Sequence, residues 1–174
     1  ILLNGNARSY GLEFMVKKSE GRFTGWISYT LSKAERRTPG IDGGKGINNG
    51  AYYVTNFDKP HNIAVTGNYQ ISDKWSVSAN FIFQSGRPGL SIPEYSERNA
   101  YRLPNYHRLD IAATLKGKQT KRWKSKWVFG IYNVYNRQNA ANITFKETLT
   151  NNNSETGLGT GNNKAYKLTY FGIV

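Results

Sequence analysis

Apolar and polar side chains alternate along two stretches of the chain, 63–71 and 75–84. In the second stretch, one parity consists of Trp75, Val77, Ala79, Phe81 and Phe83. The other parity is polar except for Ile82. Because successive side chains on a β-strand point to opposite faces, this period of two predicts strands with one apolar and one polar face. Each run lasts about ten residues, longer than the usual strand and long enough for a tilted strand to cross a bilayer.

The same two-faced pattern recurs along the chain and predicts eight strands. They span 9–18, 22–33, 60–71, 75–85, 107–116, 126–136, 142–149 and 164–174. Between the outermost apolar residues of the apolar face, no Lys, Arg, Asp or Glu occurs in the first five, as expected of a wall in lipid, where a midplane charge costs roughly 2–4 kcal/mol. The phase of 126–136 stays open between two sets, Trp127, Phe129 and Ile131 or Val128, Tyr132 and Val134.

Connections of two lengths alternate between the predicted strands. Those at 19–21 and 72–74 are tight turns, whereas those at 34–59 and 86–106 are long. This alternation is typical of an up-and-down outer-membrane barrel, and the long connections on one side predict a ligand-facing mouth. The regularity weakens after Lys116, where connections of roughly ten, five and fourteen residues are expected.

Composition supports a strand-built wall over a helical one. The chain has 174 residues, 38% hydrophobic residues and a mean hydropathy of −0.63, so it has no apolar run of transmembrane-helix length. It has no cysteine, which excludes disulfides and thiolate metal sites. The net charge of +13 first suggests nucleic acid, but the basic residues do not form one stripe. The densest basic run, 116–126, is interpreted as a connection near charged lipid headgroups, and no nucleic-acid partner is predicted.

Candidate chemistry favours binding over catalysis. His61 and His107 lie at the ends of two different predicted strands without metal-ligand spacing, and the acidic residues are scattered. No catalytic residue, metal site or cofactor is therefore predicted. The Gly-rich segment 40–46 lacks the strand–helix context of a phosphate loop and is interpreted as an outer loop.

The segment 98–110 concentrates arginine and tyrosine beside the predicted mouth. Arg108 and Asp110 share the lumenal face, where an arginine and a carboxylate either brace the wall or bind an anionic or sugar-like ligand. The candidate ligand-binding residues are Arg87, Arg98, Asn99, Tyr101, Arg102, Tyr106, Arg108 and Asp110. Trp75 and Trp127 each begin a predicted strand just after a predicted periplasmic turn, and are expected to form an interfacial girdle or, alternatively, to cap a soluble core.

Several sequence blocks together resemble a known family. They are 9–14, 21–33, 57–62, 84–88, 98–110 and 132–139, and they include Asp58-Lys-Pro-His-Asn62 and Tyr132-Asn-Val-Tyr-Asn-Arg-Gln-Asn139. In this order they are similar to the carboxy-terminal barrel of TonB-dependent outer-membrane receptors of Bacteroidetes type. The resemblance covers most of the chain, and it is specific to the family but not to a substrate.

The resemblance implies a 22-stranded transmembrane barrel around an amino-terminal plug, of which residues 1–174 would supply about eight strands. The plug, most of the barrel and the final strand would lie outside this segment. It implies import of a scarce nutrient, such as a siderophore, a vitamin, an oligosaccharide or a peptide, across the outer membrane of a Gram-negative cell. The implied partners are membrane lipid, the remaining strands, the TonB complex through the plug, and a surface lipoprotein.

Two other interpretations stay open at this level. One is a complete eight-stranded outer-membrane barrel that acts as a passive porin or adhesin, because eight strands can close around their own side chains. The other is a soluble β-sandwich binding module whose apolar faces pack against each other.

Overall fold

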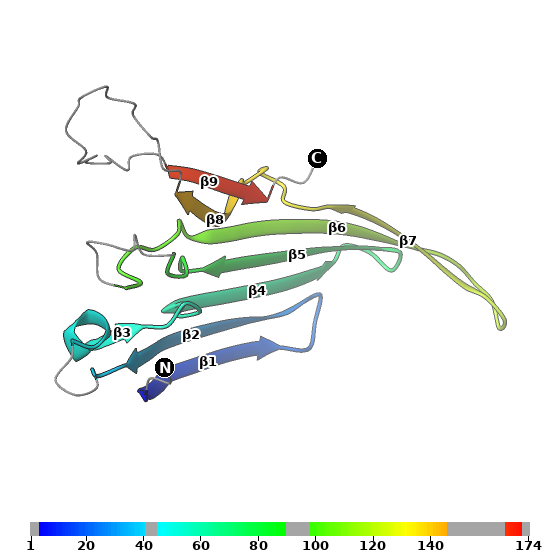
Figure 1. Cartoon of the computed structure of the whole chain (residues 1–174). Coiled ribbons are helices and arrows are strands. Elements are labelled where there is room, and N and C mark those ends of the chain that lie inside the picture. The colour runs from blue at the N-terminus through cyan, green and yellow to red at the C-terminus, as the bar shows by residue number, and fades with distance from the viewer. Residues whose placement is uncertain (1–3, 41–44, 90–97, 146–165, 172–174) are drawn as a thin grey trace, which may run out of the picture.

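The computed structural model describes residues 4–40, 45–89, 98–145 and 166–171. The all-β class is confirmed, because an antiparallel sheet carries most of these residues. Its strands lie side by side in chain order: β1 (Asn6–Lys18), β2 (Phe23–Arg37), β4 (His61–Gln70), β5 (Trp75–Gln84), β6 (Tyr106–Gln119) and β7 (Lys124–Ile131) (Figure 1). A short turn, η1 (Ile47–Gly50), and a short strand, β3 (Tyr52–Val54), which pairs with β2, lie inside the predicted connection 34–59 and were not predicted.

The strand registers place apolar residues opposite apolar residues across the sheet. Ile27 of β2 lies opposite Val65 of β4, which lies opposite Phe81 of β5. Phe81 in turn lies opposite Leu109 of β6. Because directly opposed residues point to the same side, the strands share one apolar and one polar face. The predicted alternation in the first five strands is therefore confirmed.

The register of β7 settles the phase that the sequence leaves open. Trp127, Phe129 and Ile131 lie opposite Leu115, Ala113 and Ile111 of β6. All three therefore belong to the apolar face, and Val128 lies on the polar face with Thr114.

No second layer covers the apolar face within the described residues. The only buried hydrophobic side chains there are Tyr53 and Leu103, both in the long connections. On the apolar face, Phe14 is 55% exposed, Val16 72% and Phe129 57%. Among the described residues, no helix has the length and apolar content that crossing a membrane requires.

Connections of one length gather at each end of the sheet. The short turns 19–22, 71–74 and 120–123 lie at one end, and the described parts of the long connections, 38–40, 45–60, 85–89 and 98–105, lie at the other (Figure 1). The expected connection of roughly ten residues after Lys116 is wrong, because β6 continues to Gln119 and β7 begins at Lys124. The basic run 116–126 is thus a strand hairpin, and the alternation of short and long connections persists through it.

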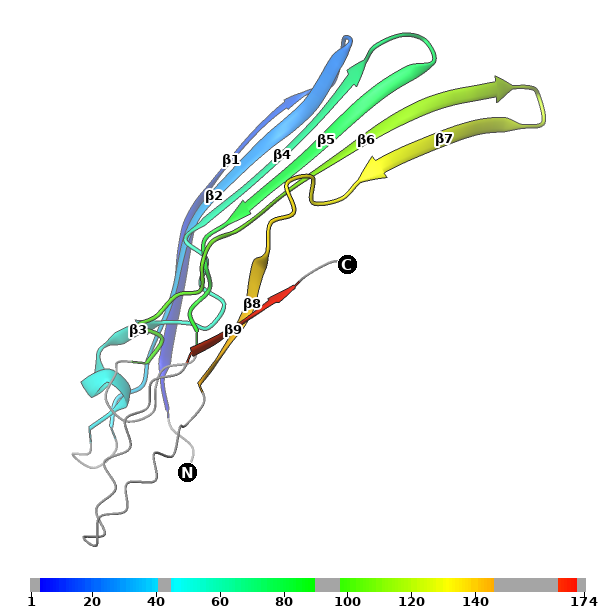
Figure 2. The same ribbon diagram turned by 90° about the horizontal axis from the view of Figure 1, so that it is seen from above.

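The predicted strand 126–136 is also wrong in its second half. β7 ends at Ile131, and β8 (Asn139–Phe145) resumes the same course beyond a kink (Figure 2). The chain between the two strands stays beside β6, because Val134 N donates to Leu109 O at 2.8 Å, and the first residue of β8, Asn139, bonds to the His107 backbone. β8 pairs with β9 (Tyr166–Phe171). Predicted positions 146–149, 164–165 and 172–174 lie outside the described residues.

The sheet is open in the part of the chain that the structure describes. β1 has one neighbour, β2, and its other edge faces no strand. β8 and β9 form a separate two-stranded sheet, so the eight predicted strands do not all belong to one sheet. The described strands therefore form a wall and do not close into a barrel.

Candidate functional site

Arg102 and Asp58 join the two long connections at one end of the sheet. The Asp58 side chain is only 1% exposed and accepts a hydrogen bond from Arg102 Nη2. Arg102 Nη1 also donates to Asp58 O and Gly86 O, both at 3.0 Å. The second carboxylate oxygen of Asp58 accepts from Ala34 N of β2 at 2.7 Å. We call Asp58, Arg102 and these partners the loop knot.

Further contacts fix the same two connections to each other. Asn99, which is 5% exposed and has φ +62, donates from Nδ2 to Val54 O at 2.6 Å. Arg98 N donates to Asn48 Oδ1 at 2.8 Å. Asparagine tolerates the left-handed conformation better than most residues, so Asn99 can turn its amide inward. The two long connections thus form one unit and not two independent loops.

Arg108 forms a second cluster, on the polar face of β6. Its Nε donates to Asp110 Oδ2 at 3.0 Å, and Nη2 lies 2.9 Å from the same oxygen. Its Nη1 donates to the hydroxyl oxygens of Tyr106, at 3.1 Å, and Tyr132. The guanidinium also lies 4.0 Å from the centre of the Tyr132 ring. Ion pairing between Arg108 and Asp110, which the sequence predicts, is confirmed, and it favours wall bracing because Arg108 has little donor capacity left.

The kink between β7 and β8 docks onto this cluster. Asp110 Oδ1 accepts from Asn133 N at 2.9 Å. Asn139 exchanges two hydrogen bonds with the His107 backbone, donating to O at 3.0 Å and accepting from N at 3.1 Å. His107 Nδ1 lies 2.8 Å from the Tyr135 hydroxyl. These side chains replace the backbone ladder that the kink interrupts, so the wall stays continuous there.

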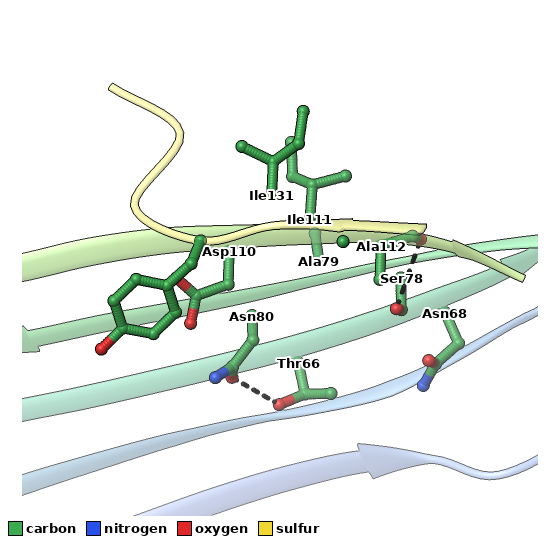
Figure 3. Close-up of a pocket in the computed structure, with 11 residues that line it drawn as sticks. Thr66, Asn68, Ser78, Ala79, Asn80, Asp110, Ile111, Ala112 and Ile131 are labelled. Atoms are coloured by element: carbon green, nitrogen blue, oxygen red, sulfur yellow. Dashed lines mark hydrogen bonds between the residues drawn. The ribbon is translucent and has the colours of Figure 1, made fainter. Parts of the chain in front are cut away.

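A shallow hollow of about 480 Å³ lies on the sheet beside Asp110. Asn80 and Thr66 are directly opposite each other, and Thr66 Oγ1 donates to Asn80 Oδ1 at 3.0 Å. Figure 3 shows Asp110, Asn80 and Thr66 on one side of the strands and Ile111 and Ile131 on the other. The polar residues that line the hollow offer amide, hydroxyl and carboxylate groups, which can hold water or a polar ligand by hydrogen bonds.

The structure divides the predicted site residues into two groups. Asn99, Arg102, Tyr106, Arg108 and Asp110 have side-chain contacts within the protein. Arg87 is exposed but donates to Ala141 O at 2.9 Å. Arg98 and Tyr101 make no side-chain hydrogen bond to another described residue and are exposed, Tyr101 by 54%. The set most available to a ligand at the mouth is therefore Arg87, Arg98 and Tyr101.

Sequence reasoning missed Asp58 and Asn139 as organising residues. Asp58 lies in the block 57–62 and Asn139 ends the block 132–139, both of which carry the family resemblance. In the structure, the blocks 57–62, 84–88 and 98–110 meet at Arg102, and 132–139 docks onto 98–110. Asp58 was missed because its partner Arg102 is 44 positions away in sequence, so no local pattern links the two.

Trp75 and Trp127 lie in one row of the sheet. Each is directly opposite Leu115, Trp75 from β5 and Trp127 from β7. Their exposed fractions are 39% and 62%. The two tryptophans are therefore two strands apart in one row on the apolar face, and the interfacial girdle stays a prediction.

Comparisons with known proteins return no match: no family model, no curated protein and no solved structure corresponds to this chain. Among the described residues, no three His, Cys, Asp or Glu side chains gather in a way that could hold a metal ion.

Proposed function

We propose that this chain is part of the wall of an outer-membrane β-barrel, in a TonB-dependent receptor that imports a scarce nutrient. Lipid contacts the apolar face, and the polar face lines a water-filled lumen. The loop knot supports the mouth, where Arg87, Arg98 and Tyr101 meet the ligand. A single observation carries the membrane part of this proposal, the slant of the apolar face across the sheet.

The apolar face of each strand ends toward the long connections. We take as its end the first residue on that face, counted in this direction, that is neither apolar nor tyrosine. From β1 to β6 these residues are Arg8, Lys33, His61, Ser85 and His107. Arg8 lies opposite Glu35, so Lys33 is two residues nearer the short-turn end. His61 lies opposite Leu31 and His107 opposite Phe83, and each adds another two residues. Ser85, which donates from N to His61 O, adds none.

The line through these five residues is the boundary of the apolar face. It moves six residues along the strands over four strand-to-strand steps. At about 3.4 Å per residue and about 4.8 Å per step, it advances roughly 20 Å over roughly 19 Å. A boundary with this slope lies about 45° from the perpendicular to the strands. Strands of membrane barrels tilt by about 35–45° relative to the membrane normal, so a flat lipid surface would cut the sheet along this line.

The open edges of the sheet support the same proposal. β1 is 13 residues long, and its outer edge leaves backbone N–H and C=O groups without a strand partner in the described structure. Backbone groups in hydrocarbon must be paired, which only a helix or a closed barrel achieves. Further strands of the same barrel would pair this edge.

The transport part of the proposal rests on the resemblance and on where its blocks lie. Four blocks that resemble TonB-dependent receptors meet at the loop knot and the Arg108 cluster. Both clusters stabilise the mouth and the polar face, where a receptor captures its solute. The implied energy source is the TonB complex, reached through a plug, and a surface lipoprotein is a further proposed partner.

Site-directed labelling tests which face meets lipid. The chain has no cysteine, so single variants such as Phe81→Cys and its neighbour Asn80→Cys can be labelled without background. In lipid vesicles, a charged aqueous thiol reagent should modify Asn80→Cys at least tenfold faster, because Phe81 is on the apolar face. Brominated lipid should quench a fluorophore at position 81 and not at 80. A sandwich would give no lipid quenching at either position.

Depth measurement tests the slant itself. Phe14 of β1 and Phe83 of β5 lie in one row of the sheet. Phe83 is two residues from the boundary residue of its strand, Ser85, whereas Phe14 is six residues from Arg8. With strands tilted by about 45°, a label on Phe14→Cys should lie about 10 Å deeper than one on Phe83→Cys. Equal depths would contradict the tilted wall.

Uptake assays test transport separately. In cells that carry the full receptor, Arg98→Ala combined with Tyr101→Ala should reduce import of the cognate solute without changing the amount of folded receptor. Glu20→Ala, in a short turn at the other end, is the control. Import that is independent of TonB would favour the passive porin.

A further inference from the structure

We propose that the β6–β7 hairpin, residues 116–126, docks an acidic polypeptide on the short-turn side of the sheet. The inference depends on the proposed function only for the side of the sheet that faces lipid.

The hairpin concentrates positive charge without any compensating acid. Its six basic residues are Lys116, Lys118, Lys121, Arg122, Lys124 and Lys126, and no Asp or Glu occurs from 111 to 146. All six are exposed, and none takes part in an ion pair within the described residues. The other two turns at this end each contain an acid, Glu20 and Asp73. An anionic partner is therefore expected at this hairpin more than at its neighbours.

The arrangement of the lysines indicates on which side that partner lies. Lys116 and Lys126 are directly opposite each other, on the polar face with Thr114 and Val128. Like charges in this position destabilise a strand pair, so a bridging anion would stabilise it. Lys124, two residues beyond Lys126, shares this face.

The opposite side of the same hairpin is neutral. Leu115 and Trp127 lie opposite each other on that side. Ser125, two residues from Trp127 toward the tip, lies on the same side. Anionic lipid next to the apolar face would meet these uncharged side chains first. The aqueous side meets Lys116, Lys124 and Lys126, which favours a soluble acidic polypeptide over a headgroup.

Hydrogen bonds within the hairpin close its turn and span its register shift. Thr120 N donates to Trp123 O at 2.8 Å and closes the turn. Gln119 Nε2 donates to Gly117 O and Ser125 O, at 3.2 and 3.1 Å, across the register shift. The tip projects beyond the other two turns (Figure 1). From Leu115 to Gln119, four residues extend it by roughly 14 Å.

Its tip carries the residue types that dominate protein interfaces. Trp123 is 79% exposed and follows Arg122. Tryptophan and arginine are enriched among interface residues whose truncation weakens binding most. The tip can therefore add an apolar anchor to the electrostatic contact.

Binding of fluorescent poly-glutamate to the protein in an uncharged detergent tests the inference. Fluorescence anisotropy should show binding that weakens at least tenfold in Lys116→Gln/Lys124→Gln/Lys126→Gln. The matched control, Lys17→Gln/Lys18→Gln/Arg22→Gln, removes three charges at the β1–β2 turn and should change affinity less than threefold. Trp123→Ala should weaken binding about fivefold, and that loss should persist at high salt because it is not electrostatic.

Four results would overturn the inference: no binding, no loss in the hairpin variant, equal loss in both triple variants, or displacement of poly-glutamate by vesicles that contain phosphatidylglycerol. The last result would assign the hairpin to lipid. Binding in detergent does not require the lipid contacts tested by labelling at positions 80 and 81. Failure of the membrane proposal and failure of this inference are therefore distinguishable.

Discussion

The two ends of the sheet are held together in different ways. At the long-connection end, the buried Asp58 joins segments far apart in sequence through Arg102. At the short-turn end, each turn closes on itself in contact with water, as when Thr120 Oγ1 accepts from Trp123 N at 2.9 Å. The same substitution should therefore destabilise the protein more at the long-connection end. Urea unfolding in detergent, followed by tryptophan fluorescence, measures each pair of variants below.

Replacement of aspartate should give the largest difference. Asp58→Ala leaves Arg102 and Ala34 N without their carboxylate and should lower the free energy of unfolding by about 3 kcal/mol. This is the lower end of the range for a broken buried pair, because the Arg102 side chain is 33% exposed and water can reach it. Asp73→Ala, in the β4–β5 turn, should change stability by less than about 0.5 kcal/mol. Similar effects at both sites would contradict the comparison.

Replacement of glycine should follow. A Cβ at Gly86 would lie 1.6 Å from Leu103 O, a backbone atom that cannot rotate away. Gly86→Ala should therefore destabilise by about 2–3 kcal/mol through overpacking. Gly21, at the β1–β2 turn, has φ +91 and no close backbone atom, so Gly21→Ala should cost about 1 kcal/mol, from its backbone conformation alone. A smaller effect at Gly86 would show that the long connections can separate freely.

The fold was predictable where side chains alternate and turns are short. Hairpin strands such as β4 and β5 are local, and their apolar period of two fixes both face and register. The kink after Ile131 was not, because Asn133 and Asn136 adopt positive φ and side chains replace the ladder. In the sequence, Tyr132 and Val134 continue the alternation of a strand, so the pattern predicts no kink there. The phase of β7 could not be predicted either, because both of its faces contain apolar residues. Only the pairing of Trp127 with Leu115 of β6 shows which set belongs to the apolar face.

The candidate site was predictable in composition and not in contacts. The proximity of Arg108 and Asp110 follows from their spacing on one strand, and the ion pair forms. The partner of Arg102 could not be inferred, because the two long connections fold against each other through contacts that no local pattern encodes. Arg102, which its charge assigned to ligand binding, therefore belongs to the loop knot, whereas Arg87 and Arg98 remain exposed at the mouth.

Replacement of an amide tests whether the kink behaves like the long-connection end. Asn139 is 6% exposed and satisfies both backbone groups of His107, so Asn139→Ala should destabilise by about 2 kcal/mol. At the short-turn end, Gln70 Nε2 donates to the backbone oxygens of Ser72 and Trp75 in contact with water. Gln70→Ala should cost about 0.5 kcal/mol. Hydrogen exchange at the His107 amide should accelerate only in the first variant.

Replacement of serine should abolish the difference between the ends and so identify its cause. Ser85 Oγ accepts from His61 N at 3.1 Å at the long-connection end, and Ser72 Oγ accepts from Trp75 N at 3.1 Å at the short-turn end. Both bonds are exposed, so water can replace the lost acceptor in either place. Ser85→Ala and Ser72→Ala should each cost about 0.5–1 kcal/mol, equal within error. If Ser85→Ala cost much more, the long-connection end would be distinguished by something other than the burial of its contacts.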